Sequence, residues 1–155
     1  EEVVISIGEN HIFSKIGNFK FTSKLIDGKF PDYNRVIPKG GDKIMISDRT
    51  SLKSMLSRAS ILSHENIRGI QLHLSKNQLQ VFANNPEHEQ AEDCLEVGYD
   101  NDDLQIGFNV SYLIDVMNVI SSENIKITML SSNSSALIEP LDDGGNLYVI
   151  MPMKL

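Results

Sequence analysis

The sequence predicts an α+β fold made of repeated β-α-β-β-β modules, in which two helices pack on antiparallel sheets. The order strand, helix, three strands occurs twice between Lys43 and Met153. The heptapeptides ILSHENI (Ile61–Ile67) and VISSENI (Val119–Ile125) stand at the same helix-to-strand junction in the two copies. Because one module cannot bury both its helix and a face of its sheet, we expect the two copies to pair around their helices.

The first module begins with a short strand at Lys43–Ile46. A helix is expected at about Asp48–Leu62, because apolar residues recur there with helical spacing. The residues of this stripe are Leu52, Met55, Leu56, Ala59 and Leu62. Period-two alternation then predicts strands near Ile67–Leu74, Leu79–Ala83 and Glu89–Tyr99.

The second module repeats this order. Its expected elements are a strand at Leu104–Phe108, a helix at Val110–Ile120 capped by Asn109, and strands at Ile125–Leu130, Ser135–Leu141 and Leu147–Met153. Ahead of both modules, Val3–Ile7, His11–Ile16 and Phe19–Ile26 are expected to form an antiparallel meander. These strands match the end of a further module, and the chain opens at Glu1 without a methionine. We therefore expect a fragment.

Composition limits the classes of function. Apolar residues make up 41% of the 155 residues, which is enough for a core, and the net charge of −7 argues against a surface that coats nucleic acid. The apolar runs are too short to span a membrane and no signal peptide is present, so we expect a cytoplasmic protein. The single cysteine, Cys94, is expected to be reduced and partly packed. The four histidines are scattered, which predicts no catalytic, metal or cofactor site.

Five separated segments carry a resemblance to a known family. They are FTSKLIDGKFPDYNRVIP (21–38), ILSHENIRGI (61–70), NQLQVFANNPEHEQAED (77–93), IGFNVSYLIDVMN (106–118) and YVIMPMKL (148–155). Together they closely resemble the beta subunit of bacterial DNA polymerase III, the sliding clamp, over essentially the whole chain. The resemblance implies the DNA-clamp fold, with residues 1–33 ending the second clamp domain and residues 34–155 forming the third.

The resemblance also implies a function without catalysis or a cofactor. A head-to-tail homodimer would encircle duplex DNA independently of sequence, at replication forks on the nucleoid. Its implied partners are the catalytic subunit of the replicative polymerase, the clamp loader, translesion polymerases and mismatch-repair proteins, which dock in a hydrophobic peptide groove. The alternative that stays open is a peptide-binding adaptor that does not encircle DNA. An enzyme has little support in the sequence.

The last residues of the chain are apolar, although chain termini are usually polar. An ordinary core strand is one explanation, but a proline interrupts ladder pairing and methionines suit a surface that accepts several ligands. By the resemblance, the peptide groove comprises Pro31, Arg35, Val36, Asn109, Tyr112, Ser135, Val149, Ile150, Met151, Pro152, Met153, Lys154 and Leu155. Asn109 is also a plausible helix cap.

Two further surfaces are implied. The resemblance places Ile61 and Leu62 at the dimer interface, where the alternative is that they close the core. Glu87, Glu89 and Asp93 would pair there with basic residues of the partner, unless they are simply a solvated edge. Phosphate contacts are expected from Arg49, Lys53 and Arg58 on the first helix, with Lys20 and Lys24 as further candidates. The alternative for each cation is a solubilising surface charge.

Overall fold

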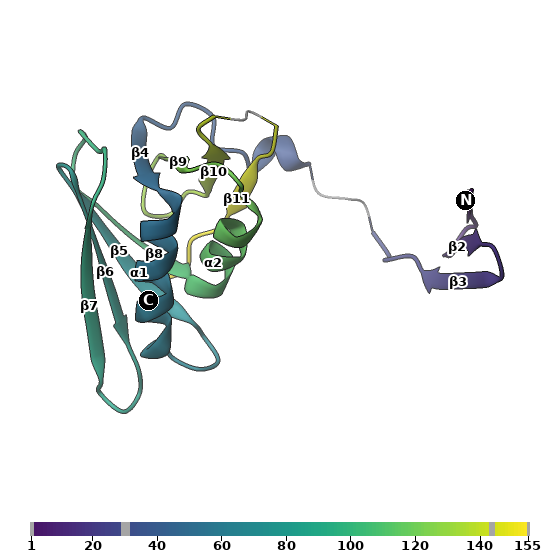
Figure 1. Cartoon of the computed structure of the whole chain (residues 1–155), viewed down its shortest axis with the longest axis horizontal. Coiled ribbons are helices and arrows are strands. Elements are labelled where there is room, and N and C mark those ends of the chain that lie inside the picture. The colour runs from purple at the N-terminus through teal and green to yellow at the C-terminus, as the bar shows by residue number, and fades with distance from the viewer. Residues whose placement is uncertain (1, 29–31, 143–144, 155) are drawn as a thin grey trace. The chain divides into compact units, whose positions relative to one another are not determined.

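A computed structural model describes residues 2–28, 32–142 and 145–154 of the chain. The chain divides into two compact units, Glu1–Asp32 and Tyr33–Leu155. Figure 1 shows the three-stranded unit and the larger α+β unit. Each is described by itself below.

The smaller unit is an antiparallel meander of β1 (Val3–Ile7), β2 (His11–Ile16) and β3 (Phe19–Lys24). The β2–β3 turn places Gly17 at φ 52°, a left-handed conformation that glycine adopts without strain. One face of this sheet is apolar, with Ile5 and Phe21 both largely exposed. The third strand ends at Lys24 rather than at the predicted Ile26.

The larger unit begins with a short 3-10 turn at Tyr33–Arg35 and contains both modules. The first module is β4 (Lys43–Asp48), α1 (Arg49–Ile61), β5 (Gly69–Ser75), β6 (Gln78–Asn84) and β7 (Gln90–Glu96). The second is β8 (Leu104–Asn109), α2 (Val110–Val119), β9 (Asn124–Met129), β10 (Ala136–Pro140) and β11 (Tyr148–Ile150). The predicted order of strand, helix and three strands is confirmed in both.

The two modules exchange their first strands. One sheet has the order β11-β10-β9-β4 and the other β7-β6-β5-β8, so each four-stranded sheet takes one strand from the other module. All the pairings are antiparallel. The helices α1 and α2 lie side by side between these sheets (Figure 1). The predicted pairing of modules around their helices is confirmed.

The core is formed by the inward stripes of the helices and the inward faces of both sheets. On α1 the buried residues are Leu52, Met55, Leu56 and Ala59, and on α2 they are Val110, Leu113, Val116 and Met117. Each helix starts at a capping side chain: Asp48 accepts a hydrogen bond from the Ser51 amide at 2.7 Å, and Asn109 accepts one from the Ser111 amide at 2.9 Å. No helix in the described part of the chain is long and apolar enough to cross a membrane.

Candidate functional site

The C-terminal segment leaves its sheet after Ile150. Pro152 has no amide hydrogen to donate, and the chain instead crosses to β8, where the Met153 amide donates to the Gly107 carbonyl at 2.9 Å. The side chain of Met151 is 62% exposed at this crossing. The predicted single strand from Leu147 to Met153 is therefore wrong beyond Ile150, and the break leaves a flexible apolar side chain on the surface.

A hollow of about 570 Å³ lies on one side of Met151. Its wall is the 3-10 turn at Tyr33–Arg35 with the segment that follows it, and its floor comes from the β9–β10 connection. The described lining residues are Asn34, Arg35, Val36, Ile37, Pro38, Lys39, Leu130, Ser134, Ser135 and Met151. Ser135 is only 8% exposed, and its hydroxyl donates a hydrogen bond to the Val36 carbonyl. This hydrogen bond therefore joins the wall of the hollow to its floor.

A second hollow of about 510 Å³ lies on the other side, between α2 and β11. Its described lining residues are Tyr112, Asp115, Val116, Leu147, Tyr148, Val149, Ile150 and Met151. Met151 lines both hollows, so one exposed methionine separates two mostly apolar depressions. Because a methionine side chain is unbranched and adapts its shape, this arrangement suits a surface that binds an extended chain with two apolar anchors.

The structure brings most of the predicted groove residues together. Arg35, Val36 and Ser135 meet Met151 at the first hollow, and Tyr112, Val149 and Ile150 meet it at the second. Pro31 and Leu155 lie outside the described residues. Among the described residues, Asn109, Pro152, Met153 and Lys154 line neither hollow.

Asn109 has a structural role in this chain. Its side chain caps α2, and its amide nitrogen lies 3.4 Å from the Ile67 carbonyl, so both of its polar groups are engaged. The predicted cap is confirmed, and a role for Asn109 in ligand binding stays a prediction.

Several lining residues were missed by sequence reasoning. Leu130 follows the buried residues Ile125, Ile127 and Met129 and breaks their alternation, and it is 44% exposed. An apolar residue out of phase at a strand end is a signal for such a surface position. Leu147 and Tyr148 line the second hollow, but nothing in their spacing distinguishes them from core residues.

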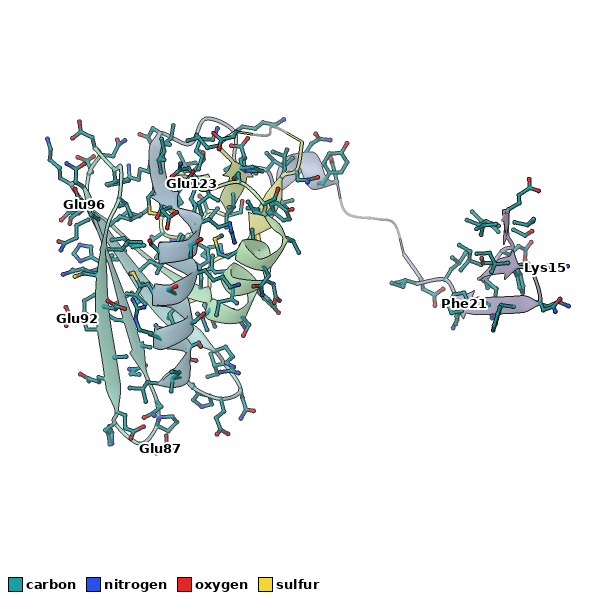
Figure 2. The ribbon with its side chains drawn as sticks, viewed as in Figure 1. Lys15, Phe21, Glu87, Glu92, Glu96 and Glu123 are labelled. Atoms are coloured by element: carbon teal, nitrogen blue, oxygen red, sulfur yellow. The ribbon has the colours of Figure 1, made fainter. Side chains whose placement is uncertain are left out.

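The predicted dimer surface lies at the opposite edge of the unit, along β7 and the end of α1. Ile61 is 77% exposed, which excludes the alternative that it closes the core of this chain, while Leu62 is half-buried. Figure 2 shows Glu87, Glu92 and Glu96 along this edge. Glu89 is held by Asn85, whose side-chain nitrogen lies 2.7 Å from its carboxylate. The role of this edge in assembly stays a prediction.

Cys94 lies on this edge strand as well. It is exposed, so the expected partial packing is wrong. The cause is the pleat of β7: Asp93 and Leu95 point toward α1 and are half-buried, and Cys94 between them points away. Among the described residues, no cluster of histidine, cysteine and acidic side chains would hold a metal ion.

Two of the three cations predicted to contact DNA already have partners within the chain. Arg49 donates from Nε to the Ser122 carbonyl and from Nη1 to the Met117 carbonyl, both at 3.0 Å. Arg58 pairs with Asp93 at 2.6 Å. In the described part of the chain, Lys53 has no ion-pair partner. Of the three, Lys53 is therefore the cation most available to a phosphate.

Comparison with known proteins decides the family. The model of the DNA polymerase III beta subunit, C-terminal domain, matches residues 34–154. The chain belongs to the DNA polymerase III beta subunit family. The model of the central domain of the same family matches residues 1–32.

Relatives in this family include the beta sliding clamp of Pseudomonas aeruginosa, which is 52% identical over 154 residues, and that of Escherichia coli, which is 48% identical over 151 residues. The chain is covered to 99% and 97%, but it spans only 42% and 41% of these relatives. A crystal structure of the P. aeruginosa beta subunit superposes with a TM-score of 0.88, covering 99% of this chain and 42% of that one. A Bartonella birtlesii sliding clamp bound to griselimycin is 38% identical with a TM-score of 0.87, covering 99% and 41%.

Proposed function

We propose that this chain is the C-terminal part of a sliding clamp, the processivity factor of a bacterial replicative DNA polymerase. The complete protein would form a head-to-tail dimer that encircles duplex DNA in the cytoplasm, at replication forks. It acts by binding alone and catalyses no reaction. The observation that carries the proposal is the pair of hollows separated by Met151, in a chain of the beta subunit family.

The two hollows are proposed to dock peptides from the polymerase catalytic subunit, the clamp loader, translesion polymerases and mismatch-repair proteins. Val36, Leu130 and Met151 offer apolar contacts to the side chains of an extended peptide. Arg35 and Lys39 on the same rim favour a peptide with a carboxylate. A small site of this kind is expected to bind with an affinity near micromolar, about −8 kcal/mol, which permits exchange of partners.

The edge formed by β7 is proposed to join two protomers. β7 is a terminal strand of its sheet, so its outer backbone groups have no strand partner within the described chain. The exposed Ile61 lies at the end of the adjacent helix, and Glu87 and Glu89 give the edge a negative charge. A basic strand from the partner would pair with the outer backbone groups of β7 and complement the negative charge of Glu87 and Glu89.

Griselimycin provides a probe for the groove, since the clamps of P. aeruginosa and B. birtlesii have been crystallised with it. We expect calorimetry to detect griselimycin binding to the complete protein, and Met151→Asp to abolish it by placing a charge between the hollows. Leu141→Asp is the matched control, because Leu141 is also an exposed apolar side chain but lies outside both hollows. Equal binding by both variants would contradict the groove assignment.

Encirclement of DNA is tested separately from peptide binding. The complete protein should be retained on a nicked circular plasmid after loading, and it should be released when the plasmid is cut to a linear form. A protein that binds griselimycin but is lost equally from circular and linear DNA would be the peptide-binding adaptor instead.

A further inference from the structure

The three-stranded sheet of the smaller unit has two chemically different faces. The strand register places Phe13 opposite Thr22 and Lys15 opposite Lys20, and His11 lies opposite Lys24. Because side chains alternate across a strand, these residues share one face. We call it the basic face; its members are Val4, Ser6, His11, Phe13, Lys15, Lys20, Thr22 and Lys24. The opposite face carries Ile5 and Phe21, and Figure 2 labels Lys15 and Phe21, one residue from each.

Cations gather on the basic face without matching anions. The sequences of the three strands contain no acidic residue. Within the described residues, Lys15, Lys20 and Lys24 form no ion pair. Like charges directly opposite each other destabilise an antiparallel pair. This concentration of cations in a chain of net charge −7 therefore favours a ligand with repeated negative charges.

An exposed aromatic side chain separates Lys15 and Lys20 from Lys24. Phe13 is 44% exposed and lies between the Lys15–Lys20 row and the His11–Lys24 row. Those rows are about 13 Å apart, from four residues at roughly 3.3 Å each. The rings of His11 and Phe13 have their centroids 6.2 Å apart and are tilted by 32°. A shallow hollow of about 230 Å³ beside Phe13 is lined in part by Val4, Lys15 and Lys20.

We propose that the basic face binds single-stranded DNA. The three lysines contact successive parts of the phosphate backbone, and a base stacks on Phe13 over the shallow hollow. Exposed aromatics between cations on a sheet suit unpaired bases, whose flat faces are free to stack. Duplex DNA gives the lysines phosphates but leaves Phe13 without a partner, because its bases are already stacked. An acidic protein segment likewise leaves the aromatic ring unused.

The choice of DNA over RNA rests on the proposed function, which places the protein at replication forks, where single-stranded template is exposed. The site itself lies outside the groove and the β7 edge. Binding of a linear single strand does not require a closed ring. A working clamp can therefore lack this single-strand site, and a protein that does not encircle DNA can still have it.

The test is fluorescence anisotropy of the complete protein with a labelled 12-nucleotide oligothymidylate over a range of salt concentrations. Each phosphate contact on a single strand contributes a slope of about −0.7 in log K against log salt. Three lysines predict a slope of about −2, and Lys15→Gln combined with Lys20→Gln should reduce it to about −0.7. Lys76→Gln removes an exposed lysine from the other unit and should change neither the affinity nor the slope.

Variants at Phe13 separate stacking from charge. Phe13→Leu should weaken binding by at least about fivefold while leaving the salt slope unchanged. Phe13→Tyr keeps a ring and should retain binding, so a loss in the leucine variant alone reports stacking rather than misfolding. Equal losses in the leucine and tyrosine variants, equal affinity for a duplex 12-mer, or tighter binding of the corresponding ribo-oligomer would each overturn the proposal.

Discussion

Arg49 is predicted to join the two modules, and its replacement should destabilise the larger unit. Its guanidinium donates to the carbonyls of Met117 and Ser122 at 3.0 Å, and its backbone amide donates to the Glu123 carbonyl at 2.8 Å. The side chain therefore binds one carbonyl in the last turn of α2 and one in the connection after it, where the helix dipole favours a cation. The Arg49→Met variant keeps an unbranched apolar stem but loses both side-chain hydrogen bonds.

The expected loss follows from those two bonds. A hydrogen bond from a charged donor is worth about 1.5–3 kcal/mol, and because solvent partly replaces the donor at the more exposed carbonyl we expect a total of about 3 kcal/mol. That loss corresponds to a decrease in the melting temperature of about 12 °C for a unit the size of Tyr33–Leu155.

Tyrosine fluorescence during urea unfolding provides the measurement. All four tyrosines lie in the Tyr33–Leu155 unit and the chain has no tryptophan, so the signal reports this unit alone. Lys53→Met is the control, because it removes a cation from the same helix at a site without an ion-pair partner in the described chain, and it should change stability by less than about 0.5 kcal/mol. The reasoning is refuted if the two variants unfold at the same urea concentration.

Three other predictions follow from the larger unit. In the complete protein, Ile61→Ala with Leu62→Ala should convert dimer to monomer in sedimentation velocity, because each buried side chain contributes roughly 1.5–3 kcal/mol; an unchanged sedimentation coefficient at micromolar concentration would contradict the interface. Deletion of residues 151–155 should abolish binding of a polymerase-derived peptide and polymerase processivity while the dimer persists, and tight binding by the truncated protein in calorimetry would place the groove elsewhere. Hydrogen bonds from Ser51 lower the pKa of Asp48 below its ordinary value of 3.8, so its stabilising effect is present above that value and is lost as pH falls through the lowered pKa. Asp48→Ala should therefore cost about 1 kcal/mol at neutral pH, and the difference from the unchanged protein should disappear in strong acid.

Local sequence patterns predicted the fold well because its strands alternate clearly and its modules repeat. Two errors lie where a contact distant in sequence ends a strand. The strand predicted to reach Tyr99 ends at Glu96, since Gly98 bridges to Ile46 on β4. The C-terminal strand ends early because Met153 pairs with Gly107 on β8. Neither pairing leaves a signal in the residues on either side of it.

At the candidate site, too, local sequence patterns predicted exposed residues but not the contacts that are distant in sequence. The exposed apolar C-terminus indicated Met151, but the two hollows beside it depend on tertiary packing. The hydrogen bond from Ser135 to Val36 joins residues 99 positions apart, and a single serine in a loop does not predict its partner. In the same way, the charges on α1 suggested DNA contacts, whereas Arg49 binds α2 and the connection after it, and Arg58 binds β7.

The exchange of first strands between the modules has a consequence for how the protein is made. β4 completes its pairing only with β9, which the ribosome synthesises after the entire first module. While β9 is missing, neither edge of β4 has a strand partner, and such unpaired strands promote association with other chains. A nascent chain that stops near Asp103 therefore has no complete sheet to fold into. We expect ribosome-bound intermediates of this length to be protease-sensitive and to acquire protection only after residue 129 has left the exit tunnel.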